Sequence, residues 1–419
     1  MIEQIFKWAR VRRRMAASEL GIILIPFALH LHSRGYTKGS ITAYVRVIEH
    51  FGRWLKQEGL AIHKINSQHI QRFVKRHLPR CRCSRPAPRD VYRCRAALNL
   101  LRRFLRDRKL IRDSEESTAN SQGLIKLLRA YDRHMHQVRG LAVATRLIRQ
   151  HYAKEFLRWR FGRRMPVLHQ LRPRDVLAFV TFRARNFTRS GTHCLTDAVR
   201  SFLRFLEFSG RIRIPLAAYV SRPVRRASPP LTKVLERDQW RTFSKSFDRS
   251  TPTGQRDYAM ALCLGLLGLR GGEVVALSLE DLNWREMTLR LGRTKQQRER
   301  LLPLPDEVAK ALVKYLQLGR PHTKSRNVFV CHRPPVGRAL KVYQVGSAMT
   351  RAFRRSGIEA GGTHILRHSW ATWAHRQGAS LKLVADVLGH RSLDTTIRYA
   401  HLNLEELRQA ALPWPETKP

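Results

Sequence analysis

The sequence predicts a mainly α-helical protein with a small β-sheet, an α+β fold in which two helical domains precede a mixed C-terminal domain. Three observations support this prediction. Apolar residues recur at helical spacing along much of the chain. A helical pattern near the N-terminus returns about 105 residues later. Two short apolar runs flank one polar turn in the last third. A chain of 419 residues has room for two to four such domains.

The first helical domain is predicted over residues 1–116. Its apolar stretch from Leu20 to Leu31 follows several arginines and resembles a signal peptide. Pro26 and His30 interrupt the stretch, however, and no small-residue cleavage site follows. We therefore expect a buried helix there. Because no run in the sequence is long enough to cross a membrane, we expect a cytoplasmic, nucleoid-associated protein that has no membrane partner.

The second helical domain, predicted over residues 124–222, looks like a duplicate of the first. Its similarity could also be chance, because amphipathic helices resemble one another. A polar linker at 114–122 separates the two. The matched positions are Arg34-Gly35 with Arg139-Gly140, Phe51 with Phe156, Trp54 with Trp159, and Ile70–Val74 with Val176–Val180.

The charge of the chain indicates a polyanionic partner. It has 80 basic residues against 31 acidic ones, a formal net charge of +49. A face covered with one sign of charge repels itself in water, whereas on DNA it displaces counterions. We therefore expect both helical domains to bind double-stranded DNA. An arginine- and proline-rich linker at 223–230 then leads to the C-terminal domain, predicted over residues 231–412, with a short tail at 413–419.

The C-terminal domain is predicted to contain both helices and strands. Its apolar run at 257–267 indicates a buried helix that stops near Gly268. Strands are expected at 288–291 and 301–304 around a polar turn, and a further short strand at 327–331. The pattern at 306–318 indicates an amphipathic helix.

Four residues that suit phosphodiester chemistry lie close together near the C-terminus. His364 and Arg367 are three residues apart, so in a helix they share one face. His390 follows 23 residues after Arg367, and Tyr399 nine residues later. A guanidinium binds phosphate, imidazoles move protons near neutral pH, and a phenol can be a nucleophile. This set could attack a phosphodiester without a metal.

The pattern His-x-x-Arg, Leu-Gly-His and then Tyr resembles the signature of the tyrosine recombinase (phage integrase-like) family. The family also carries an upstream Arg followed by Glu, and a Lys on a β-hairpin. Gly268-Leu269-Arg270-Gly271-Gly272-Glu273 resembles the first, and Gly292-Arg293-Thr294-Lys295 the second. The resemblance covers roughly residues 231–415. It implies a tyrosine recombinase catalytic domain preceded by helical SAM-like DNA-binding domains, of which the second copy looks like the usual core-binding domain.

The resemblance also implies the role of each residue. Tyr399 would attack the scissile phosphorus, giving a 3′-phosphotyrosine and a free 5′-hydroxyl. Arg270 and Arg367 would hold the non-bridging oxygens, and Glu273 would orient Arg270 or its helix. Lys295 would protonate the leaving 5′-oxygen.

The two family histidines complete the expected set. His364 would accept or relay the proton of Tyr399, and His390 would contact the phosphate. His368 is expected only to pack or cap. No cofactor, ATP or metal is expected, since the arginines do what a metal would. A metal site at Cys81, Cys83 and Cys94, with His77 just upstream, is a weaker expectation, because the usual C-x-x-C pairs are absent.

The expected function is site-specific DNA recombination or integration. The family resemblance implies a synaptic tetramer on DNA, with residues 403–412 docking on a neighbouring copy, and it leaves helper recombinases possible. The extra helical domain favours a mobile element and transposition over chromosome resolution. A type IB topoisomerase and a non-catalytic DNA-binding relic are the alternatives. Relaxation by a monomer would favour the first, and failure to form a covalent DNA complex the second.

Overall fold

The computed structural model describes residues 20–83, 87–111, 119–162, 164–221, 233–292, 299–359 and 361–389. These residues fall into three stretches: the first helical region (20–111), the second helical region (119–221) and the C-terminal region (233–389). The described chain divides into two compact units, and the boundary between Gly52 and Arg53 falls inside one continuous helix, α4. None of the described helices is long and apolar enough to span a membrane.

The first helical region begins with the apolar stretch that mimics a signal peptide. It forms α3, in which Leu24, Phe27 and Leu31 are almost completely buried. The expectation of a buried helix is thus confirmed. Asn66 caps α5 by accepting two backbone N–H groups, and Asp90 caps α6 by accepting the backbone N–H of Arg93. The elements are α3 (Gly21–Ser33), α4 (Lys38–Gln57), η1 (Ile62–Lys64), α5 (Ser67–Arg72), η2 (Phe73–His77), η3 (Leu78–Arg80) and α6 (Val91–Asp107).

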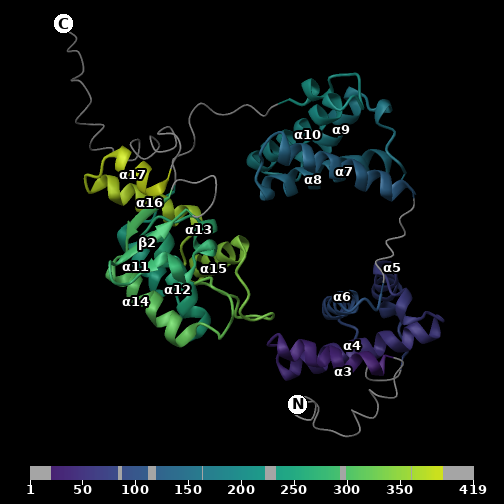
Figure 1. The fold of residues 1–419 in the computed structure, drawn as a ribbon, viewed down its shortest axis with the longest axis horizontal. Coiled ribbons are helices and arrows are strands. Elements are labelled where there is room, and N and C mark those ends of the chain that lie inside the picture. Colours follow the sequence, from purple (N-terminus) through teal and green to yellow (C-terminus); the bar gives the residue numbers. More distant parts are fainter. Residues whose placement is uncertain are drawn as a thin grey trace. The chain divides into compact units, whose positions relative to one another are not determined.

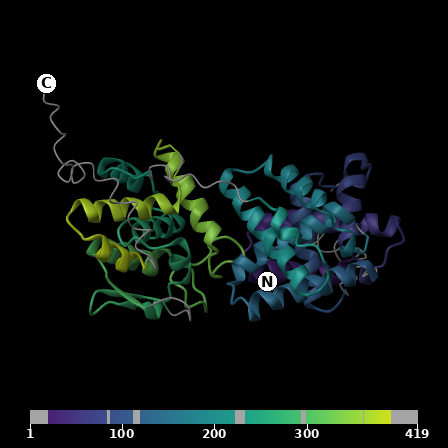
Figure 2. The same ribbon diagram turned by 90° about the horizontal axis from the view of Figure 1, so that it is seen from above.

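The second helical region repeats this order of helices, which Figures 1 and 2 show as a bundle. Helix α8 starts 105 residues after α4, and Phe51 and Phe156 are both fully buried. The matched tryptophans differ, since Trp54 is 3% exposed and Trp159 is 40% exposed. The elements are α7 (Ala119–Gln137), α8 (Val143–Phe161), η4 (Leu168–Gln170), α9 (Pro173–Ala184), α10 (Arg189–Phe208) and η5 (Leu216–Tyr219).

The C-terminal region packs helices around a three-stranded antiparallel sheet with the order β1-β2-β3. The sheet register pairs Leu289 with Leu282 on one side and with Leu302 on the other. Helix α12 is buried along most of its length and contacts α13, α14, α15 and α16. It is therefore the central helix of this region (Figure 1).

The remaining elements follow the predicted pattern with one difference. Residues 327–331 form only isolated bridges, from Asn327 to Ser278 and from Val330 to Ala339, instead of a strand. The elements are α11 (Arg237–Lys245), α12 (Pro252–Gly265), α13 (Gly271–Ala276), η6 (Leu279–Asp281), β1 (Leu282–Asn283), β2 (Thr288–Leu291), β3 (Arg300–Pro303), α14 (Asp306–Lys314), η7 (Tyr315–Gly319), α15 (Val342–Arg355), α16 (Thr363–Arg376) and α17 (Leu381–Leu388). The prediction of a mainly helical fold with a small sheet is confirmed.

Candidate active site

The site is built around the carboxylate of Glu273, in the first turn of α13. Arg270 is the N-cap residue of this helix, and its backbone N–H donates to Glu273 Oε2 over 2.7 Å. A carboxylate in this position satisfies an unpaired N–H group and lies favourably at the positive end of the helix. Glu273 is only 8% exposed, so its charge needs partners inside the protein.

Three guanidinium groups supply those partners. Arg270 Nη1 donates to Glu273 Oε1 over 3.0 Å, and Arg300 Nη2 donates to the same oxygen over 2.5 Å. Arg367 Nη1 lies 3.9 Å from the other carboxylate oxygen. Three positive charges against one negative charge leave the cluster with a net charge of +2. A site with this excess attracts an anion, and the Arg270 side chain, 35% exposed, is accessible to one.

Backbone carbonyls hold the same guanidinium groups in place. Arg367 donates to Gly268 O over 2.6 Å and to Leu388 O over 2.7 Å. Arg270 donates to Gly389 O over 3.2 Å, and Arg300 donates to a carbonyl near the end of α17. The last carbonyls of a helix lack partners within it and attract cations. The end of α17 is therefore tied to the arginines of α13, β3 and α16.

A glycine at the end of α17 allows this close approach. Gly389 has a φ of +61°, which is unfavourable for residues with a side chain. A Cβ atom at this position would also lie 2.9 Å from the guanidinium carbon of Arg300. The Leu-Gly-His motif thus needs its glycine for a backbone reason.

The remaining predicted residues fall into two groups. His364 lies in the first turn of α16 and is exposed, one helical turn before the buried Arg367. Its ring centroid lies 6.3 Å from that of His368. Lys295, His390 and Tyr399 lie outside the described residues. The structure therefore brings together Arg270, Glu273 and Arg367, and places His364 on the helix that carries Arg367.

Arg300 is the site residue that sequence reasoning missed. Its contact with Glu273 and its side-chain exposure of 12% assign it to the cluster. Its position at the start of β3, directly before the strand predicted at 301–304, was the available signal.

The cysteine cluster differs from the sequence expectation. Cys81 and Cys83 lie together with His50 and His77 in the first helical region. Cys94 is buried elsewhere and does not belong to this group. The expected set of Cys81, Cys83 and Cys94 is therefore replaced by two cysteines and two histidines.

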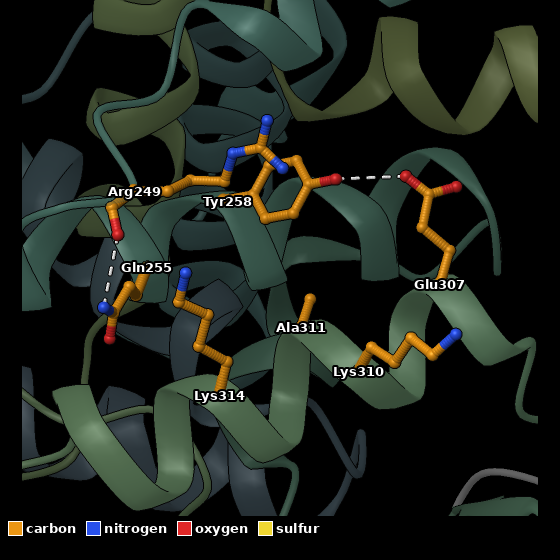
Figure 3. A pocket seen from close by; sticks show the side chains of 7 residues that line it. All are labelled: Arg249, Gln255, Tyr258, Glu307, Lys310, Ala311 and Lys314. Atoms are coloured by element: carbon orange, nitrogen blue, oxygen red, sulfur yellow. Dashed lines mark hydrogen bonds between the residues drawn. The ribbon is translucent and has the colours of Figure 1, made fainter.

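A separate pocket of about 260 Å³ lies between α12 and α14 (Figure 3). Tyr258 donates to Glu307 over 3.0 Å at its rim, and Arg249 stacks on the Tyr258 ring at 4.6 Å. Lys310 and Lys314 also line it. None of the predicted active-site residues within the described ranges lines this pocket, so we do not assign the candidate active site to it.

Comparison with known proteins agrees with the chemistry of the arginine cluster. Residues 233–406 match the "Phage integrase family", and residues 25–109 match the "Phage integrase, N-terminal SAM-like domain". A protein of Sinorhizobium fredii (strain NBRC 101917 / NGR234), named "Putative integrase/recombinase y4rA", is 36% identical over 398 residues, which are 94% of this chain and 95% of that protein. The chain belongs to the phage integrase family. It is a tyrosine-type site-specific DNA recombinase.

Two further relatives extend the comparison. Tyrosine recombinase XerD of Listeria monocytogenes serotype 4b (strain F2365) is 33% identical over 243 residues, 56% of this chain and 79% of that protein. The structure of the Tn1549 transposon integrase in complex with a circular intermediate DNA is similar in fold, with a TM-score of 0.51 and 14% identity over 67% of this chain and 99% of that one.

The SAM-like match falls on the first helical region. The internal comparison of the sequence instead assigned the core-binding role to the second. That assignment stays a prediction, because the matched residues do not reach the second region. Two relatives align over nearly the whole of this chain, and their alignments therefore cover both helical regions.

Proposed function

We propose that this recombinase cuts and rejoins double-stranded DNA through a covalent 3′-phosphotyrosine on Tyr399. The observation that carries the proposal is the cluster of three arginines around Glu273, with a net charge of +2 beside the segment that leads to His390 and Tyr399. Such a cluster stabilises the charge that develops on a phosphorane-like transition state.

In the proposed reaction the Tyr399 oxygen forms a bond to phosphorus while the bond to the 5′-oxygen breaks. His364 takes the phenolic proton, and Lys295 gives a proton to the departing 5′-oxygen. His390 donates a hydrogen bond to the phosphate. Because the phosphotyrosine keeps the energy of the phosphodiester, a 5′-hydroxyl from a partner strand reverses the step without ATP or a metal. The proposed role of Arg270 and Arg367 is to bind the two non-bridging oxygens.

The proposed DNA partner explains the charge of the two helical regions. Exposed arginines on their helices would neutralise phosphates, so affinity should fall with salt at a slope of about −0.9 per phosphate contacted. The related structures are recombinases bound to DNA, and one belongs to a transposon. These relatives support a mobile element as the system that this enzyme serves. We further propose a tetramer that holds two DNA sites, with residues 403–412 docking between copies.

The test is covalent trapping on a nicked duplex taken from the flanks of the encoding locus, among fragments that the protein binds. The short piece released by cleavage diffuses away, so the adduct accumulates. We expect an adduct on a denaturing gel in the presence of EDTA with the wild type, and none with Tyr399→Phe. Tyr343→Phe, which changes an exposed tyrosine of α15, is the matched control and should keep the adduct.

Four results would contradict the proposal. An adduct that persists in Tyr399→Phe would mean another nucleophile. A requirement for a divalent metal would mean another mechanism. Tight binding without any adduct would favour the non-catalytic alternative. Supercoil relaxation by a monomer, without strand exchange between two sites, would favour the type IB topoisomerase alternative.

A further inference from the structure

Two histidines and two cysteines gather in the first helical region, and none of them takes part in the proposed reaction. They are His50, His77, Cys81 and Cys83, and one nitrogen or sulfur atom of each lies within 4.8 Å of the others. His50 comes from α4, and His77 closes η2. The two cysteines follow η3. The group therefore joins α4 to the segment that leads into α6.

The spacing of these atoms fits a tetrahedral metal. His77 Nε2 lies 3.5 Å from Cys83 Sγ. In a tetrahedral zinc site with Zn–N of about 2.1 Å and Zn–S of about 2.3 Å, a nitrogen and a sulfur ligand are about 3.6 Å apart. Two thiolates with two imidazoles form one of the usual ligand sets of structural zinc, and four protein ligands leave no open position.

The surroundings orient each histidine toward the group. His50 Nδ1 lies 3.2 Å from Pro88 O. When Nδ1 carries the proton and donates it to this carbonyl, Nε2 keeps the lone pair, which is the usual outer contact of a metal-bound histidine. The His77 ring stacks on Phe73 with centroids 5.1 Å apart.

The cysteine loop is also held in a form suited to a metal. The backbone N–H of Cys83 donates to Cys81 Sγ over 3.4 Å, a contact that stabilises a thiolate. Arg89 donates to Cys81 O over 2.7 Å and fixes the loop from its other side.

In the second helical region, an ion pair stands at the positions that correspond to His50 and His77. At the offsets that relate the two copies, 105 for α4 with α8 and 106 for α5 with α9, His50 matches Glu155 and His77 matches Arg183. In the second region these two form an ion pair at 2.9 Å. The same two helices are thus joined at the same point in both copies, by opposite charges in one and by metal-ligand side chains in the other.

We propose that His50, His77, Cys81 and Cys83 bind one Zn²⁺ ion that fastens the first helical region. Binding forms two Zn–N and two Zn–S bonds and releases the protons of the two thiols to solvent. The ion has a structural role, separate from DNA cleavage, because all four positions are occupied by protein. Without it, two thiols and two imidazoles face one another at the contact between the helices.

The test measures metal in the full-length protein after any affinity tag has been removed. Mass spectrometry should find one zinc per chain, and Co²⁺ should replace it with the visible bands of a tetrahedral site and a thiolate-to-cobalt charge-transfer band. The double variant Cys81→Ser with Cys83→Ser should lose the ion and the charge-transfer band. Cys94→Ser, a buried cysteine of α6 outside the group, is the matched control and should keep both.

Stability gives a second readout that does not depend on measuring bound metal. A strong chelator should lower the melting temperature of the wild type by at least about 5 °C and leave that of the double variant unchanged. The proposal is overturned if the wild type binds no zinc when zinc is supplied. It is also overturned if the double variant keeps the ion, or if Cys81 and Cys83 form a disulfide in protein purified under reducing conditions.

Discussion

Carboxylates hold arginines in two contrasting ways in this molecule. In the C-terminal region the buried Glu273, whose side chain is 7% exposed, contacts Arg270, Arg300 and Arg367 at once. In the second helical region the carboxylates lie in less buried ion pairs, as in Arg183 with Glu155, where the side chains are 24% and 29% exposed.

The difference shows what each arrangement can tolerate. A half-exposed ion pair contributes little to stability and can be exchanged for other chemistry, as the change from Glu155 and Arg183 to His50 and His77 suggests. A buried carboxylate shared by three cations cannot lose a member without leaving a charge uncompensated. The predictions below test this contrast, beginning with the largest expected effect.

Arg367→Lys should have the largest effect. A lysine cannot hold Gly268 O, Leu388 O and a phosphate together, because it lacks the planar fork of donors. We expect the rate of covalent DNA cleavage to fall about 10²–10³-fold, with DNA affinity nearly unchanged. Single-turnover trapping on the nicked duplex measures the rate. Arg326→Lys, at an exposed pair with Glu280, is the control and should leave the rate unaltered.

Arg300→Lys should have a smaller effect on the same rate. Arg300 touches Glu273 and the end of α17, so we expect it to position Arg270 and the segment before His390. We expect a fall of roughly tenfold, since small displacements of catalytic groups are costly. Arg290→Lys on β2, 47% exposed, should be silent. Equal losses of cleavage rate in Arg300→Lys and Arg290→Lys would argue against a positioning role for Arg300.

His332 should make the stability of the C-terminal region depend on pH. Burial, with a contribution from the charge of Arg256, lowers the pKa of His332 from 6.5 to about 4. The unfolded chain therefore takes up this proton first as the pH falls. The contribution of the neutral His332 to the free energy of unfolding is therefore complete above pH 6.5 and is lost as the pH falls from 6.5 to 4. Allowing for partial exposure, the loss is about 1–2 kcal/mol.

To isolate the effect of His332, the free energy of unfolding is measured by denaturant unfolding at several pH values for the wild type and for His332→Gln. Glutamine can still hydrogen-bond to Tyr315, which lies 3.3 Å from the imidazole. The difference between the two proteins should change across pH 6.5 to 4 and stay flat above it. A flat difference throughout would mean that His332 titrates normally.

Glu155→Gln should have the smallest effect. The ion pair with Arg183 is half-exposed, so we expect a loss of about 0.5 kcal/mol in the free energy of unfolding, which becomes smaller at high salt. A loss of several kcal/mol would show that the helical pairs are as interdependent as those around Glu273. Thermal unfolding at two salt concentrations makes the measurement.

Much of this organisation could be predicted from the sequence because it depends on local pattern. The helical periodicity predicted α12 and α14 close to their observed positions, and the repeat at an offset of about 105 predicted that α4 and α8 correspond. Arg300 could not be assigned, since its partner Glu273 lies 27 residues away and its second contact 87 residues away. The histidines of the cysteine cluster were hidden for the same reason, because His50 meets Cys81 only through the fold.

The most direct test compares Glu273→Gln with Glu155→Gln on the same trapped substrate at saturating DNA. Both substitutions remove one carboxylate charge and keep the side-chain shape. If Glu273 assembles the phosphate-binding arginines, its variant should form the Tyr399 adduct about 100-fold more slowly at nearly unchanged DNA affinity, while Glu155→Gln cleaves like the wild type. Equal cleavage rates in the two variants, or a loss in Glu273→Gln that comes only from weaker DNA binding, would contradict this account.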